Sequence, residues 1–177
     1  MFHRLTLVGY RACGKSTIGR IVADRLHWPF HDADVRIEQH LGTSIADCFA
    51  QQGEAAFRKA ESAVLVDILA GPEPLILSTG GGAVLAVENR DLLRARGGTV
   101  VYLEASAAVL QARLRANAGD RPSLSGADVA EEVPAILAKR APLYRAVAHR
   151  VVDAGQAPGE IATALLRIVE NLPEIRQ

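Results

Sequence analysis

The stretch Gly9-Tyr10-Arg11-Ala12-Cys13-Gly14-Lys15-Ser16 fits the pattern G-x-x-x-x-G-K-[ST] close to the start of the chain. An apolar segment, Leu5–Val8, precedes it and predicts a buried strand, and residues 16–26 carry apolar positions at helical spacing. A glycine loop between a strand and a helix turns its backbone N–H groups toward a polyphosphate, and the helix N-terminus adds partial positive charge. We therefore expect Lys15 to reach the β- and γ-phosphates and Ser16 to bind Mg²⁺.

The alternative is a glycine-containing turn before an ordinary helix. With glycine at ~7% of an average protein, the four fixed positions coincide by chance in fewer than about one such chain in a hundred. The strand before the loop and the helix after it make a coincidence rarer still. The pattern thus predicts a nucleoside triphosphate as ligand.

Composition narrows the class of protein. The chain has 177 residues, 49% hydrophobic and 23% charged, with a formal net charge of zero, which is typical of one globular domain spanning residues 1–177. It has no basic run, so we expect no nucleic-acid partner. No apolar stretch is long enough to span a membrane, and the first strand begins too near Met1 for a cleavable signal peptide. Two cysteines without a C-x-x-C motif suit a reducing compartment. We expect a cytoplasmic monomer.

Short apolar segments alternate with longer helical patterns along the chain, which predicts an α/β fold with helices on both faces of a parallel sheet. The expected strands are Leu5–Val8, Pro29–Asp32, Leu75–Ser78, Val100–Leu103 and Arg150–Val152. The expected helices are Ser16–Leu26, Val35–Leu41, Ser44–Gln51, Glu54–Ala70, Asn89–Arg96, Ala107–Arg115, Val129–Ala148 and Gly159–Asn171. Ligands of such sheets bind at the carboxyl ends of the strands.

Three further features belong to that end of the sheet or close to it. Asp32 and Asp34 end the second strand, where one carboxylate can hold Mg²⁺ through water and the other can orient a substrate hydroxyl; the alternative is a helix cap. Gly80–Gly82 follows the third strand and indicates close approach of a ligand, or else a flexible turn. The segment Asn117–Gly126 is rich in helix breakers and reads equally as a surface loop or as a mobile lid.

The chain also resembles the shikimate kinase family. The segments GYRACGKSTIGR, FHDADVRIEQHLGTSIADCFAQQGEAAFRKAE, LSTGGGAV, DRPSL and KRAPLY follow the family's order and spacing from Leu5 to about Asp153. The resemblance implies a three-layer α/β/α P-loop kinase with a five-stranded parallel sheet. It also implies transfer of the γ-phosphoryl group of ATP to the 3-hydroxyl of shikimate, in the pathway to chorismate and aromatic amino acids.

The resemblance assigns residues to the nucleotide. Ser16 and, through water, Asp32 would hold Mg²⁺, and Arg121 would be the lid arginine that closes on the phosphates within a lid at 117–126. Arg115 would lie along the adenine. The full set expected to bind ATP is Ala12, Cys13, Gly14, Lys15, Ser16, Thr17, Arg115 and Arg121.

The resemblance also assigns residues to shikimate. Asp34 would hold ring hydroxyls nearest the attacking oxygen, and Gly81 would offer its backbone. Arg58 and Arg140 would grip the carboxylate, since guanidinium groups match a carboxylate in shape and charge. Lys15, Asp34 and Arg121 are the expected catalytic residues.

Two other functions remain open at this stage. A related small-metabolite kinase, acting for example on gluconate, would share the phosphate loop, but the combination of Asp34, Arg58, the triple glycine and Arg140 argues against it. A catalytically silent nucleotide-binding module would usually lose Lys15, Asp34 or a substrate arginine, and none of these is lost here.

Overall fold

The structure is a computed structural model that describes residues 3–116 and 130–171. A five-stranded sheet runs through its centre in the order β2-β3-β1-β4-β5, and every neighbouring pair is parallel. The strands are β1 (Arg4–Val8), β2 (Phe30–Asp32), β3 (Leu75–Ser78), β4 (Thr99–Glu104) and β5 (Arg150–Asp153). The predicted α/β class and all five strands are confirmed.

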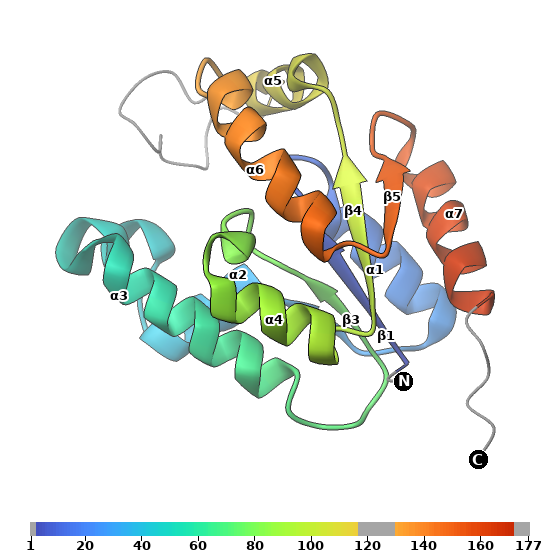
Figure 1. The fold of residues 1–177 in the computed structure, drawn as a ribbon, viewed down its shortest axis with the longest axis horizontal. Coiled ribbons are helices and arrows are strands. Elements are labelled where there is room, and N and C mark those ends of the chain that lie inside the picture. Colours follow the sequence, from blue (N-terminus) through green and yellow to red (C-terminus); the bar gives the residue numbers. More distant parts are fainter. Residues whose placement is uncertain (1–2, 117–129, 172–177) are drawn as a thin grey trace.

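Helices cover both faces of the sheet, as predicted. They are α1 (Lys15–Leu26), α2 (Ala33–Leu41), α3 (Ile45–Ile68), α4 (Val87–Arg96), α5 (Ala107–Ala116), α6 (Val133–Val147) and α7 (Pro158–Glu170), with a short 3-10 helix η1 (Ala83–Leu85). Helices α1 and α7 pack together on one face, and α3, α4 and α6 lie on the other (Figure 1). No helix within the described ranges is both long and apolar enough to cross a membrane.

One helix differs from the sequence-based expectation in its continuity. The two helices expected at 44–51 and 54–70 form the single element α3, but Gly53 inside it has φ 79° and ψ 174°, which is not helical. A glycine adopts this positive φ without the steric strain of a side chain. The predicted break is therefore present as a sharp kink rather than as a loop.

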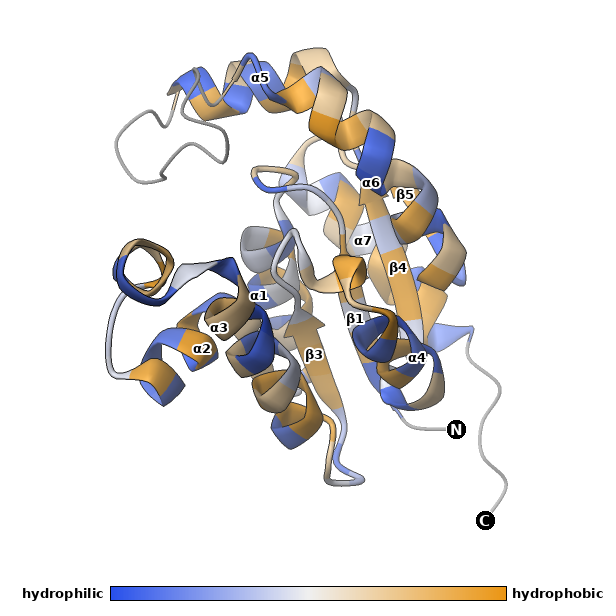
Figure 2. Ribbon diagram, turned by 60° about the vertical axis from the view of Figure 1, so that its left-hand side comes forward, coloured by the Kyte–Doolittle hydropathy of each residue, from blue (hydrophilic) through white to orange (hydrophobic). Residues whose placement is uncertain are grey.

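The core forms around the middle strands. Leu5, Leu7, Ile76, Leu77 and Val101 are fully buried, and β3 and β4 are predominantly hydrophobic along their length (Figure 2). Strands that are covered by helices on both faces become apolar throughout instead of alternating. This packing fixes the carboxyl end of β1, from which the glycine loop starts.

A buried arginine ties the opposite end of the sheet together. The Arg4 guanidinium donates to the carbonyl oxygens of Leu69 (3.1 Å), Glu73 (3.3 Å), Arg96 (3.0 Å) and Gly71. These carbonyls come from the end of α3, the turn before β3 and the end of α4. Arg4 therefore joins two separate connections, α3–β3 and α4–β4, to the first residue of β1.

Candidate active site

The glycine loop has the backbone of a phosphate-binding loop. Gly9 (φ 148°), Ala12 (φ 64°) and Gly14 (φ 103°) all have positive φ. A side chain at Gly9 would be impossible, because its Cβ would lie 2.7 Å from the carbonyl oxygen of Leu103. Gly14 is the N-cap of α1, and since it has no side chain to cap the helix, the first N–H groups of α1 are left for a ligand.

Lys15 is folded back onto this loop. Its ammonium group donates to the carbonyl oxygens of Gly9 (2.8 Å) and Tyr10 (3.0 Å), and it lies 3.8 Å from the sulfur of Cys13. The residue is 7% exposed. The loop thus stores a buried cation beside the site where the pattern predicts phosphate groups.

Oxygen ligands for a cation lie next to the loop. The Ser16 hydroxyl donates to Asp32 Oδ2 (2.5 Å) and lies 3.3 Å from the Ser78 hydroxyl. Asp32 also caps α2, because its Oδ1 accepts the Asp34 N–H at 3.1 Å. The capping role considered as an alternative for this aspartate is therefore real, and it coexists with the contact to Ser16.

Asp34 occupies the first turn of α2 rather than the strand, so helical geometry sets its direction. Its Oδ1 would lie 2.8 Å from a Cβ at Gly80, and Glu61 Oε1 would lie 2.9 Å from the same point. The two carboxylates therefore converge on the glycine loop after β3. Only a glycine fits between them.

The arginine on α3 is held by two carboxylates. Arg58 NH1 lies 2.7 Å from Glu61 Oε2, and NH2 lies 3.0 Å from Glu54 Oε1. Burial lowers the pKa of Arg58, but the two glutamates outweigh this effect and raise it above its ordinary value. A Cβ at Gly82 would lie 2.5 Å from the guanidinium nitrogens, so the loop Gly80–Gly82 passes directly against this cation.

Glu61 is a site residue that the sequence reasoning missed. Its side chain is 1% exposed, and its Oε1 has no hydrogen-bond partner among the described residues. Burial raises the pKa of Glu61, and the charge of Asp34 raises it further, while Arg58 and Arg140 oppose the shift. The i, i+3 spacing from Arg58 on a predicted helix was the signal that could have found it.

Helix α6 contributes the second arginine. Arg140 NH1 lies 3.4 Å from the carbonyl oxygen of Gly81, and the Tyr144 hydroxyl donates a short hydrogen bond to the same oxygen. Tyr144 is fully buried and stacks on Tyr102 with ring centroids 5.1 Å apart. Gly81 in turn packs on the phosphate loop, because a Cβ there would lie 3.1 Å from the Arg11 nitrogen.

Helix α5 carries one arginine expected to bind the nucleotide and another that contacts the phosphate loop. Arg115 is exposed in the last turn of α5. Arg113, which the sequence reasoning missed, donates instead to the carbonyl oxygens of Cys13 (3.2 Å) and Ala154 (2.8 Å). It joins the phosphate loop to the start of the β5–α7 connection, and no local motif marks it.

The expected lid arginine, Arg121, and the segment 117–126 lie outside the described residues. Of the other predicted site residues, the structure brings together Lys15, Ser16, Asp32, Asp34, Arg58, Gly81 and Arg140 around the carboxyl ends of β1, β2 and β3. In the described ranges, no group of three or more His, Cys, Asp or Glu side chains could hold a metal ion.

Comparison with known proteins points in one direction. A sequence profile described as shikimate kinase matches residues 11–170. Shikimate kinase 2 of Pectobacterium carotovorum is 43% identical over 169 residues, covering 94% of this chain and 96% of that protein. The solved structure of shikimate kinase from Acinetobacter baumannii in complex with shikimate has a TM-score of 0.89 at 33% identity, covering 98% and 97% of the two chains. A gluconokinase from Sinorhizobium meliloti, with a TM-score of 0.60 at 20% identity, shares the fold alone.

Proposed function

The chain belongs to the shikimate kinase family, and from this premise we propose which of its residues carry out the reaction. The protein is an enzyme that transfers the γ-phosphoryl group of ATP to the 3-hydroxyl of shikimate. Its product, shikimate 3-phosphate, belongs to the pathway to chorismate and the aromatic amino acids. The gluconate and silent-module alternatives are not favoured.

The nucleotide end of the site is the loop from Ala12 to Thr17. Its backbone N–H groups and the N-terminus of α1 take the β- and γ-phosphates. Lys15 exchanges the carbonyl oxygens of Gly9 and Tyr10 for phosphate oxygens and so neutralises charge on the transferring group. Phosphoryl transfer depends on such positioning and neutralisation more than on covalent chemistry. We assign Arg115 to the adenine from the family resemblance.

Ser16 and Asp32 fit a magnesium ion. Their oxygen atoms lie 2.5 Å apart beside the loop, and Mg²⁺ prefers a few hard oxygen ligands together with water and phosphate. Ser16 would bind the ion directly and Asp32 through water. When bound, Mg²⁺ supplies charge neutralisation at the phosphates.

The acceptor end is formed by Arg58, Arg140, Gly81 and Asp34. The two guanidinium groups bind the shikimate carboxylate, and the backbone of Gly81 contacts the sugar-like ring. Asp34 orients the 3-hydroxyl and accepts its proton as the oxygen attacks the γ-phosphorus. Glu61 holds Arg58 through the 2.7 Å ion pair. This buried partner sets the direction of the Arg58 guanidinium group.

The observation that carries these assignments is the position of Gly81. Its backbone lies against Arg11 in the phosphate loop, while its carbonyl oxygen accepts from Arg140 and Tyr144. A shikimate molecule bound at the loop Gly80–Gly82 is therefore next to the phosphates of ATP. This is the proximity that a phosphoryl transfer requires.

The test compares acceptors. ADP release is measured with shikimate, gluconate and a nucleoside monophosphate, and we expect turnover with shikimate alone. Lys15→Ala should abolish that turnover, because the cation facing the transferring phosphoryl group is lost. Turnover with gluconate, or no shikimate-dependent turnover in the parent protein, would contradict the proposal. A cytoplasmic location and a monomeric state, checked by fractionation and by sedimentation, belong to the same proposal.

A further inference from the structure

A buried ion pair joins the phosphate loop to the start of α6. Arg11 NH2 lies 3.1 Å from Glu132 Oε2, and the two side chains are 13% and 3% exposed. The pairs Arg36–Asp67 and Arg94–Asp91 are far more exposed. Removing two charges from water is costly unless each group holds the other in good geometry. A pair this dry therefore fixes the relative positions of the two segments that carry it.

Those two segments are also linked through Gly81, which contacts both of them. Arg140 and Tyr144 on α6 donate to the carbonyl oxygen of Gly81, and Gly81 packs against the backbone nitrogen of Arg11. Contacts therefore run from the Arg11 side chain to Glu132, along α6 to Arg140, through Gly81 and back to the Arg11 backbone. Arg140 lies eight residues beyond Glu132, a distance of about 12 Å along a helix.

Bound nucleotide would act on this ring next to Arg11. Lys15 donates to the carbonyl oxygens of Gly9 and Tyr10, the two residues before Arg11. When Lys15 turns to a phosphate, these bonds are exchanged, and the loop backbone beside Arg11 changes its partners. A ligand can influence a second site only through contacts that differ between the two states, and the ion pair with Glu132 is the contact nearest to this exchange that reaches α6.

We propose that Arg11 and Glu132 are positioning residues that hold α6 in register with the phosphate loop, so that bound nucleotide sets Arg140 for the shikimate carboxylate. The inference rests on the proposed function. It assigns a task to two residues that touch neither the phosphates nor shikimate in the assignments above. Its consequence is that ATP raises the affinity for shikimate, and that Glu132 transmits the effect.

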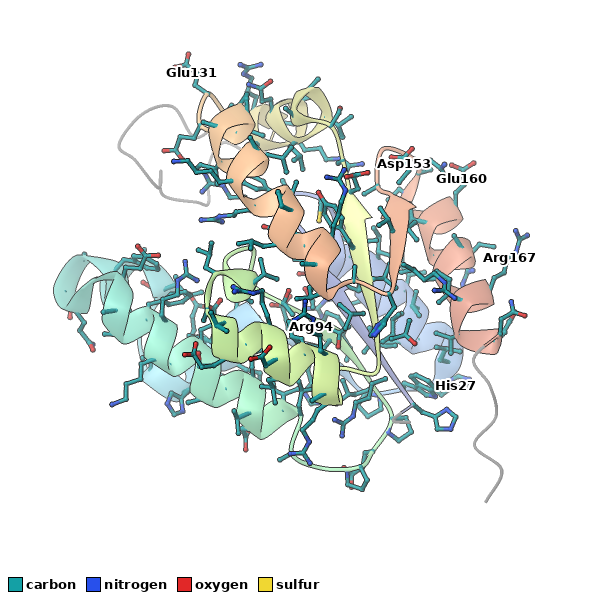
Figure 3. The ribbon with its side chains drawn as sticks, viewed as in Figure 1. His27, Arg94, Glu131, Asp153, Glu160 and Arg167 are labelled. Atoms are coloured by element: carbon teal, nitrogen blue, oxygen red, sulfur yellow. The ribbon has the colours of Figure 1, made fainter. Side chains whose placement is uncertain are left out.

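The chain offers a matched control for Glu132. Its neighbour Glu131 is exposed and projects away from the N-terminal end of α6 (Figure 3). Glu131→Gln removes the same charge from the same helix end, where negative charge stabilises a helix dipole. Glu132→Gln removes that charge and the ion pair as well. A difference between the two variants therefore reports the pair and not the helix end.

The experiment measures shikimate binding by calorimetry with and without a saturating non-hydrolysable ATP analogue and magnesium. In the parent and in Glu131→Gln, we expect the analogue to tighten shikimate binding by about fivefold or more, the usual size of coupling between sites. In Glu132→Gln, the ratio should fall toward one. The shikimate KM should rise about tenfold while kcat changes less than about threefold, because the carboxylate site is displaced and the phosphate loop is intact.

Two further variants separate positioning from a loss of folding. Glu132→Asp keeps the charge on a shorter side chain and should recover part of the coupling. The double variant Arg11→Met/Glu132→Gln should be no worse than Glu132→Gln alone, because residues of one interacting pair do not give additive losses. Urea unfolding confirms that each protein measured is folded.

Several results would overturn the inference. These are an equal analogue effect in the parent and in Glu132→Gln, the absence of any effect in the parent, strictly additive losses in the double variant, or a fall in kcat with an unchanged shikimate KM. A parent protein without shikimate-dependent turnover would overturn the proposed function and this inference with it. A parent with full turnover and an unaffected Glu132→Gln variant would overturn only the role of the ion pair.

Discussion

The Ser16 hydroxyl donates to the carboxylate of Asp32 across 2.5 Å, joining the first turn of α1 to the end of β2. The other oxygen of this carboxylate accepts the N–H of Asp34. The contact places Asp32 on the nucleotide side, whereas Asp34 converges with Glu61 on Gly80 in the loop after β3. Two aspartates separated by one residue thus lie at different ends of the site, Asp32 at the nucleotide end and Asp34 at the acceptor end.

The first prediction separates these aspartates. Asp32→Asn removes a negative charge beside the Mg²⁺ site and so lowers the affinity for the ion. Raising the magnesium concentration should therefore restore part of the kcat of this variant. Asp34→Asn loses the charge that orients the hydroxyl and accepts its proton, so kcat should fall by at least about a hundredfold, with no rescue by magnesium. The measurement is a magnesium titration of kcat together with calorimetry of nucleotide binding. Rescue of Asp34→Asn by magnesium would show that its assigned role is wrong.

The second prediction concerns the guanidinium on α3. Arg58→Lys keeps the charge but loses the planar fork, so the shikimate KM should rise about tenfold while the ATP KM stays within about twofold. The exposed arginine of the Arg36–Asp67 pair provides the control Arg36→Lys, which should change neither value. If both KM values rise equally in Arg58→Lys, this arginine supports the fold and not the substrate.

The third prediction concerns the pH dependence of stability. Because burial and Asp34 raise the pKa of Glu61 above 4.5, the native state holds this proton more tightly than the unfolded chain does. The free energy of unfolding should therefore decrease as the pH rises from 4.5 through the folded-state pKa. Glu61→Gln cannot titrate, so its stability relative to the parent should improve as the pH rises over that window.

Urea unfolding across the window, read against the parent, checks this sign. Glu54→Gln is the control, because Glu54 binds the same arginine with a side chain that is 62% exposed. Its stability relative to the parent should vary little with pH. A Glu61→Gln variant that loses stability relative to the parent as the pH rises would contradict the prediction.

The fourth prediction concerns the far end of the sheet. Arg4→Met leaves the carbonyl oxygens of Leu69, Gly71, Glu73 and Arg96 without this donor, and should lower the free energy of unfolding by about 3 kcal/mol or more. The substrate KM values should be unchanged in the folded variant, because the active site lies at the opposite end of the strands. Arg150→Met, at an exposed position of β5, should cost less than about 1 kcal/mol.

Local patterns predicted the elements because each short apolar run became a strand, and β1, β3 and β4 in the middle of the sheet are buried. A break between the helices expected at 44–51 and 54–70 was also predicted, and it is present as a kink at Gly53, since glycine takes that backbone angle readily. The start of α2 was placed two residues too late, at Val35 instead of Ala33. The cap formed by Asp32 explains the difference, because it stabilises a helix that begins immediately after the strand.

The contacts within the site depended on distances between segments that no local pattern contains. Glu61 could have been predicted from its spacing from Arg58. Its proximity to Asp34 depends on how α2, α3 and the loop Gly80–Gly82 pack together, which no local pattern contains. Arg113 contacts carbonyl oxygens that are 100 and 41 residues away along the chain. The role expected for Arg121 stays a prediction.

The position of β1 in the middle of the sheet has a consequence for synthesis on the ribosome. It is the first strand to be translated, yet its neighbours are β3 and β4, so it has no partner until the chain has grown to Ser78. Closing such long loops is slow, because chain entropy is lost before any contact is gained. The strand that leads into the nucleotide-binding motif therefore has no strand partner through more than a third of translation.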